Sequence, residues 1–265
     1  MKTILITGST DGIGKLVAHQ LAKENHQLLL HGRNDHKLEQ TITEIKVSSN
    51  NANIQGYVAD LSETESILGA IRKLTSEHSK IDVFINNAGV FKSPTSNASE
   101  GFDIRFMVNY FAPYILTNGL VKLLENSDEP RLINLSSAAQ STVSSAALSG
   151  KQSLSTQEAY AQSKLALTMW SFWMARRYPQ FNVIAVNPGS LLNTKMAQEA
   201  YGQYWSSADK GASILYDLAV SMEYKDQSGK YFDNDKGTFD RAHSDAYDEN
   251  KIAELITNTN ELLGL

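Results

Sequence analysis

Short apolar runs rich in β-branched residues recur along the chain, separated by longer segments with the periodicity of a helix. Six runs have this character: "TILIT" (3–7), "HQLLLH" (26–31), "NIQGYVA" (53–59), "KIDVFIN" (80–86), "RLINLS" (131–136) and "FNVIAVN" (181–187). Runs of this length that do not alternate with polar residues are typical of strands buried on both faces of a parallel sheet. Each run therefore predicts one strand of such a sheet.

The segments between these runs predict helices. Apolar positions at helical spacing occupy 15–25, 36–47, 63–78 and 102–124, the last with a kink at Pro113. Alternation of strand and helix predicts the α/β class, as a single doubly wound Rossmann-type domain over residues 1–265. We expect a mainly parallel sheet of about seven strands flanked by helices.

Two segments do not fit this alternation. Residues 138–157 are rich in Ser and Ala and predict a surface loop. Residues 190–210 mix Leu, Met and aromatic residues with loop-forming ones. One interpretation is a mobile lid over the carboxyl edge of the sheet that becomes ordered on ligand binding. The other is a small amphipathic helix whose aromatic side chains pack permanently on the core.

Composition narrows the classes of function. The 265 residues are 42% hydrophobic and 20% charged with a net charge of -5, which is typical of a soluble globular protein without a basic surface for nucleic acid. The chain has no cysteine, which excludes disulfides and thiolate chemistry, and no metal site is predicted. A β-branched run begins at residue 3 and no window reaches the ~18–20 apolar residues of a membrane span, so a cytoplasmic location is expected.

Glycines 8, 12 and 14 lie between a predicted strand and a predicted helix, in "TGSTDGIG" (7–14). Glycines at such a turn let backbone N–H groups approach a diphosphate, and the helix N-terminus adds partial positive charge. The spacing G-x-x-x-G-x-G differs from the commoner G-x-G-x-x-G of dinucleotide-binding folds. Because similar turns occur without a ligand, the pattern alone leaves both interpretations open.

Tyr160 and Lys164 lie four residues apart in "YAQSK" (160–164), on one face of a predicted helix. For a tyrosine with a pKa of about 10 to act as a base near neutral pH, its phenolate needs ~4 kcal/mol of preferential stabilisation. A neighbouring ammonium supplies part of it. The alternative is a half-exposed helix whose Tyr packs and whose Lys extends into water.

Taken together, the motifs resemble the short-chain dehydrogenase/reductase family. They occur in the family's order between residues 3 and 194: "TGSTDGIG", "NNAG" (86–89), Asn109, "NLSS" (134–137), "YAQSK" and "NPG" (187–189). Ser137 and Tyr160 are 23 residues apart, farther than in the shortest members. This spacing is similar to the retinol-dehydrogenase-like and WW-domain-oxidoreductase-like branch, which acts on apolar carbonyls or alcohols.

The resemblance implies an oxidoreductase that transfers a hydride between a nicotinamide cofactor and a carbonyl or alcohol. Tyr160 is implied to be the acid/base, with Lys164 lowering its pKa, and Ser137 to bind the substrate oxygen. Ser136 is the less favoured of the two serines. Asn109 is implied to hold a water through its main chain, although an Asn here can equally mark a helix kink.

The resemblance also assigns residues to the cofactor. They are Gly8, Ser9, Thr10, Gly12, Ile13, Gly14, Arg33, Asp60, Leu61, Asn87, Ala88, Gly89, Tyr160, Lys164, Pro188, Gly189 and Thr194. Two assignments have alternatives. Asp60, implied to contact adenine, can instead cap a helix, because "DLSETE" contains S-x-x-E. Thr194, implied to contact the nicotinamide carboxamide, lies one residue later than the commonest spacing.

The end of the second predicted strand, "LLLHGRND", bears on the choice of cofactor. NAD-binding members carry an acidic residue there, whereas this chain has Gly32 and Arg33. An arginine can pair with a 2′-phosphate, which favours NADP(H) over NAD(H). The alternative is a solvated arginine that opens a helix. Asp11 departs from the pattern, because many NADP-preferring relatives place Lys or Arg there.

The expected partner is a small-molecule carbonyl or alcohol. A homodimer through the helices carrying Asn109 and Tyr160 is also considered, because "LALTMWSFWMA" (165–175) is apolar, unless residues 138–157 cover that surface. The alternative function is a dinucleotide-binding regulator or scaffold, a class that tends to lose the Ser, Tyr or Lys present here. An epimerase or dehydratase needs a larger C-terminal domain than residues 195–265 provide.

Overall fold

The computed structural model describes residues 1–265, apart from the side chains of Ala200 and Tyr201. Its centre is an eight-stranded sheet in the order β3-β2-β1-β4-β5-β6-β7-β8. The strands are β1 (Thr3–Ile6), β2 (Gln27–Gly32), β3 (Ile54–Val58), β4 (Val83–Asn86), β5 (Arg131–Leu135), β6 (Asn182–Asn187), β7 (Lys230–Asp233) and β8 (Thr238–Asp240). Seven are parallel and β8 is antiparallel to β7, which confirms the predicted fold class.

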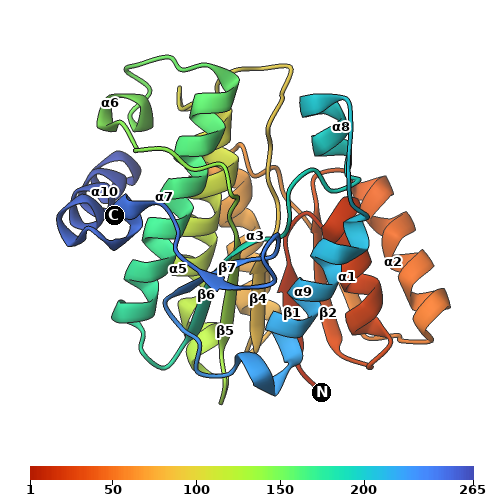
Figure 1. The fold of residues 1–265 in the computed structure, drawn as a ribbon. Helices are drawn as coiled ribbons and strands as arrows, with labels where there is room; N and C mark the ends of the chain where they lie inside the picture. The colour runs from red at the N-terminus through yellow and green to blue at the C-terminus, as the bar shows by residue number, and fades with distance from the viewer.

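Helices cover both faces of the sheet (Figure 1). One face carries α1 (Gly12–Ala22), α2 (Asp35–Ser49) and α9 (Ala208–Val220), and the other carries α3 (Thr64–Glu77), α5 (Ala112–Glu125) and α7 (Thr156–Arg177). Each face has its own core. On β1, Ile4 and Ile6 pack into one core and Leu5 into the other. Burial on both faces is the reason why these strands show no alternation of apolar and polar residues.

The strand order reverses at β1, which lies between β2 and β4. The connections that follow β1 and β4 run to opposite faces of the sheet, so a crevice opens beyond the carboxyl ends of these two strands. The glycine-rich turn follows β1, and "NNAG" includes the last residue of β4. The topology therefore brings two motifs that are far apart in sequence to one place.

The long helix predicted over 102–124 is divided. It consists of α4 (Ile104–Phe106), a π-helical turn η1 (Met107–Phe111) and α5, with Pro113 in the first turn of α5. The irregularity thus lies one turn before the predicted position. Pro113 has no N–H to donate to the carbonyl of Asn109, four residues earlier, so the regular bonding pattern cannot continue through Asn109.

The two less regular segments each contain a short helix. Residues 138–157 include α6 (Ser145–Leu148) before α7 begins, and residues 190–210 include α8 (Lys195–Tyr201). The hydrophobic pattern did not indicate β7, β8 or the C-terminal α10 (Glu249–Leu263), nor the 3₁₀ turns η2 (Met222–Tyr224) and η3 (Ser244–Tyr247). In the part of the chain that is described, no helix combines the length and apolarity needed to cross a membrane. The cytoplasmic location stays a prediction.

α10 packs beside α7 (Figure 1) and is hydrogen-bonded to η1. The buried hydroxyls of Tyr110 and Thr259 are hydrogen-bonded at 2.8 Å, and the Tyr114 hydroxyl donates to Asn260 Oδ1 at 2.6 Å. Most of the apolar stretch 165–175, including Trp170, is buried within the chain. The surface invoked for a homodimer is therefore largely used internally, and the homodimer itself stays a prediction.

Thr259→Val should lower the free energy of unfolding by about 1–3 kcal/mol, because it leaves the buried Tyr110 hydroxyl without its partner. Urea unfolding followed by circular dichroism measures this change. Tyr110→Phe combined with Thr259→Val should lose less than the sum of the two single variants, because removing both partners leaves no unpaired hydroxyl. Strictly additive losses would show that this bond does not hold α10 in place.

Candidate active site

Tyr160 and Lys164 lie at the start of α7, whose position is fixed by a capping box. The Ser155 hydroxyl accepts from the backbone of Glu158, and the Glu158 carboxylate accepts from the backbone of Ser155. Lys164 follows Tyr160 by about one turn, so it faces the carboxyl end of the sheet from the same side of the helix. The capping box thus fixes the start of α7 and, with it, the backbone positions of Tyr160 and Lys164.

Lys164 is buried, with 3% of its surface exposed. Its Nζ donates to the carbonyl oxygen of Leu135, the last residue of β5, at 2.7 Å, and lies 5.7 Å from the centroid of the Tyr160 ring. Burial lowers the pKa of Lys164 to about 7. A phenolate at Tyr160 would favour the ammonium and be favoured by it, because opposite charges in a dry site offset each other's desolvation. The alternative of a lysine extended into water is therefore wrong.

Ser137 lies two residues beyond Leu135. Its Oγ accepts the backbone N–H of Ala139 at 3.1 Å, so the hydroxyl hydrogen remains available for donation to a ligand. Ser136 is placed differently: it is buried and its Oγ bonds to Thr168 of α7 at 2.6 Å. Ser137 is thus only partly buried, while Ser136 joins the end of β5 to α7.

Two residues that the sequence did not single out hold the backbone of Ser137. The Ser137 carbonyl accepts from the Tyr231 hydroxyl at 3.0 Å and from Gln140 Nε2 at 2.8 Å. Gln140 Oε1 in turn accepts the backbone N–H of His243 at 3.2 Å. Tyr231 belongs to β7, 94 residues along the chain, so no local pattern around "NLSS" could have indicated it.

Asn109 is buried in the π-helical turn, and its side chain is fully occupied. Oδ1 accepts the N–H of Val90 at 2.8 Å, while Nδ2 donates to the Val90 carbonyl and to Ser163 Oγ, both at 3.0 Å. The side chain therefore joins the segment after β4 to α7. Any role in a proton relay is left to the main chain of this wide turn.

The glycine-rich turn and the "NNAG" segment touch. A Cβ on Gly8, whose φ is +65°, would lie 2.9 Å from Ala88 Cα, and one on Gly14 would lie 2.3 Å from Asn87 Nδ2. Asn87 Nδ2 donates to the carbonyls of Thr7 and Gly8 at 2.8 and 3.0 Å. Glycine is thus required at positions 8 and 14, because a larger side chain there would collide with the "NNAG" segment. The Asn87 amide group, assigned to the cofactor from the sequence, is used to hold the turn.

The first turn of α1 supplies donors at the crevice. Asp11 caps α1 by accepting the N–H of Gly12 at 2.8 Å, and the following N–H groups, beginning with Ile13, have no carbonyl within the helix. A diphosphate fits such a helix N-terminus. Asp11 is also ion-paired with Lys37 at 2.7 Å, and the hydrogen bond from Lys37 is the main cause of the lowered pKa of Asp11.

Other residues assigned to the cofactor line the same edge. Ser9 is buried and Thr10 packs against Gly32 at the end of β2. Arg33 follows directly and is exposed, and the described side chains include no ion-pair partner for it. A guanidinium there is free to meet an anionic ligand.

The Asp60 carboxylate does not cap α3, contrary to the alternative considered from S-x-x-E. Asp60 Oδ1 accepts from the N–H and hydroxyl of Ser62 at 2.9 and 2.6 Å, while α3 begins after Glu63 without a side-chain cap. The carboxylate prefers the nearer donors of its own turn. Leu61 is buried beside it, and contact of Asp60 with adenine stays a prediction.

The segment after β6 lies across the crevice. A Cβ on Gly12 would lie 3.5 Å from Thr194 Cγ2, and one on Gly89 would lie 3.4–3.6 Å from Asn109 Oδ1, Met196 Cε and Lys164 Nζ. The Thr194 hydroxyl accepts the N–H of Ala197 as the cap of α8.

The turn that leads into this segment is held by the residue that follows β7. The Pro188 carbonyl accepts from Asn234, and Gly189 has a φ of +121° that favours glycine. Thr194 is thus brought to the glycine-rich turn, although its contact with nicotinamide is untested.

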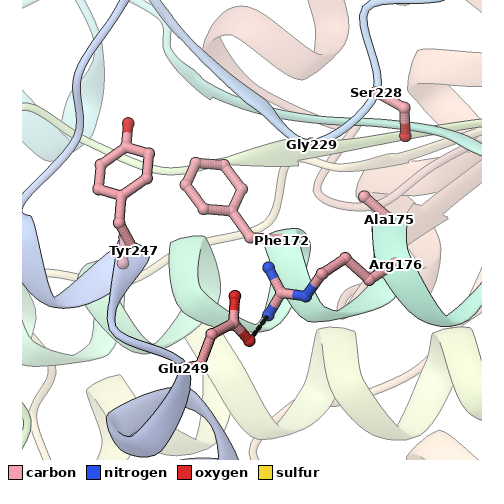
Figure 2. A pocket seen from close by; sticks show the side chains of 8 residues that line it. Phe172, Ala175, Arg176, Ser228, Gly229, Tyr247 and Glu249 are labelled. Carbon is pink, nitrogen blue, oxygen red and sulfur yellow. Dashed lines mark ion pairs between the residues drawn. The ribbon is translucent and has the colours of Figure 1, made fainter.

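A separate cavity of about 260 Å³ lies between the end of α7, the turn before β7 and the start of α10 (Figure 2). Phe172 and Tyr247 form its apolar side, and Arg176 is ion-paired with Glu249 at 3.0 Å. None of the predicted site residues lines it. Within the described residues no group of three or more His, Asp or Glu side chains is arranged to hold a metal ion.

Comparisons with known proteins agree with the motifs. A family model described as short chain dehydrogenase matches residues 2–205. The chain is 32% identical over 284 residues to retinol dehydrogenase 13 of Mus musculus, covering 100% of this chain and 84% of that protein. It is 28% identical over 284 residues to polyprenol dehydrogenase of Homo sapiens, covering 100% and 86%.

Solved structures share the fold. A protein of Mycobacterium paratuberculosis superposes with a TM-score of 0.79 at 23% identity, covering 99% of this chain and 93% of that one. A protein of Shigella flexneri complexed with NADP superposes with a TM-score of 0.70 at 26% identity, covering 88% and 97%. The family model and the full-length relatives together settle the family. The chain belongs to the short-chain dehydrogenase/reductase family of oxidoreductases, which act on CH–OH and C=O groups.

Proposed function

We propose that this protein is an NADP(H)-dependent oxidoreductase that interconverts an apolar carbonyl compound and its alcohol. The observation that carries the proposal is the buried Lys164 ammonium, 5.7 Å from the centroid of the Tyr160 ring and bonded to Leu135 just before Ser137. This arrangement joins an acid/base, a group that adjusts its pKa and a hydroxyl donor at the carboxyl edge of the sheet.

Each residue has a chemical task in this proposal. The bound nicotinamide supplies or accepts the hydride. Tyr160 donates its proton to the substrate oxygen during reduction and removes it during oxidation. Ser137 donates a hydrogen bond to the same oxygen, which stabilises the negative charge that develops there. Lys164 stabilises the phenolate, and the main chain around Asn109 positions a water that returns the proton.

The cofactor preference rests on Arg33. The family binds NAD(P), and one structural relative was solved with NADP. In this chain the exposed Arg33 follows β2, the strand whose end carries an acidic residue in NAD-binding members. A guanidinium forms charge-assisted bonds with a 2′-phosphate, so we infer a preference for NADP(H).

The substrate class rests on the apolar surroundings of Tyr160. The Phe91 ring packs edge-on against the Tyr160 ring with centroids 5.0 Å apart. Residues 190–210 lie across the crevice, with Tyr204 and Trp205 largely exposed rather than packed on the core. We infer that this segment is a lid whose aromatic side chains form an apolar wall when a substrate is bound. The relatives named for retinol and polyprenol accord with an apolar substrate.

Tyr160→Phe should lower turnover by about 10²–10⁴, the usual contribution of a positioned acid/base, while NADPH binding and folding change little. NADPH consumption with a panel of aldehydes, ketones and quinones of graded size measures turnover. Tyr216→Phe on α9 is the matched control and should retain full activity. More than half of the activity in Tyr160→Phe would overturn the assignment. Tight NADPH binding without turnover of any substrate would favour the regulator.

Arg33→Ala should weaken NADPH binding by about 1.5–3 kcal/mol and NADH binding much less, because only NADPH carries the 2′-phosphate that the guanidinium pairs with. Titration of protein fluorescence with each cofactor gives the two dissociation constants. Arg72→Ala, which removes an exposed arginine of α3, should change neither. Equal losses for both cofactors would make Arg33 a solvated surface arginine.

Residues 190–210 should show slower hydrogen exchange when NADPH and a substrate analogue are bound, because a lid becomes ordered on closing. Trp205→Ala should then raise KM for bulky carbonyls more than for small ones, since it shortens the apolar wall. Met222→Ala, another exposed apolar residue, should leave KM unchanged. Exchange that is already slow without ligands and unaffected by them would indicate a fixed helix.

A further inference from the structure

His31 lies near the end of β2 with only 6% of its surface exposed, between two loops that carry residues assigned to the cofactor. Its Nδ1 accepts the backbone N–H of Gly8 at 3.1 Å, and its Nε2 lies 3.0 Å from the carbonyl oxygen of Ala59. A carbonyl can only accept and an amide N–H can only donate. The neutral ring with its proton on Nε2 is therefore the one form that satisfies both contacts.

The backbone of His31 strengthens this link. Its carbonyl accepts from both the N–H and the hydroxyl of Ser9, at 2.9 and 3.1 Å. Two successive residues of the glycine-rich turn are thus bonded to His31. On the other side, Ala59 is followed directly by Asp60. One buried residue joins the turn assigned to the diphosphate with the loop assigned to adenine.

We propose that His31 is a positioning residue for the dinucleotide: its neutral imidazole holds the glycine-rich turn and the loop after β3 at a fixed separation, and its protonation releases the turn. The proposal rests on the proposed function, because it assumes that this turn binds the cofactor. His31 itself need not touch the ligand. Its contribution is the pre-organisation of the Gly8 backbone, which lowers the ordering cost of binding.

The direction of the pH effect follows from the charges around the ring. Burial lowers the pKa of His31, and the Asp60 carboxylate, the charged group acting on the ring from the loop after β3, opposes this only in part. The glycine-rich turn contributes backbone groups and the Ser9 hydroxyl. Because the folded pKa is below the unfolded value of about 6.5, the stabilisation is complete above that pH and is lost as pH falls through the folded pKa.

Protonation also reverses a contact. A proton on Nδ1 would face the N–H of Gly8, placing two donors against each other in a buried site. The turn must then move or the ring must leave its place. Either change disturbs the backbone that is assigned to the diphosphate.

Two substitutions separate the two hydrogen bonds of the ring. In His31→Asn, Oδ1 takes the place of Nδ1 and can accept from Gly8, but nothing reaches Ala59. In His31→Gln, Nε2 takes the place of the ring Nε2 and can donate to Ala59, but Gly8 loses its acceptor. We expect the NADPH dissociation constant at pH 7.5, measured by fluorescence titration without turnover, to rise about tenfold in His31→Gln and less than about threefold in His31→Asn.

His26→Gln is the matched control. His26 precedes β2 at the opposite edge of the sheet, and burial also lowers its pKa. Its loss should alter melting temperature without changing the NADPH dissociation constant. Melting temperatures of all variants at pH 7.5 show which of them remain folded under the binding conditions.

The pH dependence is measured with NADH rather than NADPH. The 2′-phosphate of NADPH is a phosphomonoester that titrates at about pH 6 and would add a pH dependence of its own. As pH is lowered from 7.5 to the acid limit of the folded state, found from melting temperatures, the NADH dissociation constant should rise in the wild-type protein and stay nearly constant in His31→Asn, which has no ring to protonate. Equal losses of affinity in the Asn and Gln variants, or the same pH dependence in wild type and His31→Asn, would overturn the proposal. A wild-type protein that binds neither dinucleotide would overturn the proposed function as well, whereas binding unaffected by His31 variants overturns this inference alone.

Discussion

The close approach of the glycine-rich turn to the segment after β4 is the constraint on which the rest of the site depends. Thr7 Oγ1 accepts the backbone N–H groups of both Asn87 and Ala88 at 3.0 Å, and the Asn87 amide donates back to the turn. The strand order reverses at this boundary, so no helix crosses over it and the carboxyl ends of β1 and β4 stay open. The glycines at 8 and 14 are the residues that permit the two backbones to meet there.

The same edge determines the electrostatics of the acid/base pair. Lys164 reaches the sheet from α7 and donates to the last carbonyl of β5, in a place where water cannot solvate its charge. Removing an ammonium from water is costly unless an opposite charge or strong acceptors compensate. In the proposed function, the phenolate of Tyr160 is the opposite charge that compensates the buried ammonium of Lys164.

Much of the fold could be predicted from the sequence because its strands are buried on both faces. Runs such as 3–7 and 131–136 have no polar alternation, and a parallel sheet is the arrangement that buries them completely. β7 and β8 escaped this pattern because charged residues interrupt "KYFDNDKGTFD": only two residues of β7 are buried, and β8 is the edge strand, where charged residues are tolerated. The division of the helix at η1 escaped it too, because the missing donor of Pro113 acts four residues away.

The site was predicted less completely than the fold, since several of its contacts join distant parts of the chain. The order of the motifs indicated which residues lie at the crevice, but the hydrogen bonds from Tyr231 to Ser137 and from Gly8 to His31 depend on the completed sheet. Asp60 shows the reverse case. The S-x-x-E pattern made a helix cap by Asp60 possible, but the Asp60 carboxylate instead accepts hydrogen bonds from the N–H and hydroxyl of Ser62, which are nearer in space.

The C-terminal part of the chain supports a site to which it adds none of the predicted residues. The family model ends at residue 205, whereas Tyr231 of β7 and the backbone of His243 lie beyond it and secure the loop that carries Ser137. α10, farther along, covers the helices that present Asn109 and Tyr160. The residues that are proposed to act in the reaction lie within the part of the chain that the family model matches. Residues after that part hold the loop of Ser137 and cover the helices of Asn109 and Tyr160. Changes after residue 205 are therefore able to displace the backbone of Ser137 without altering any residue that is proposed to react.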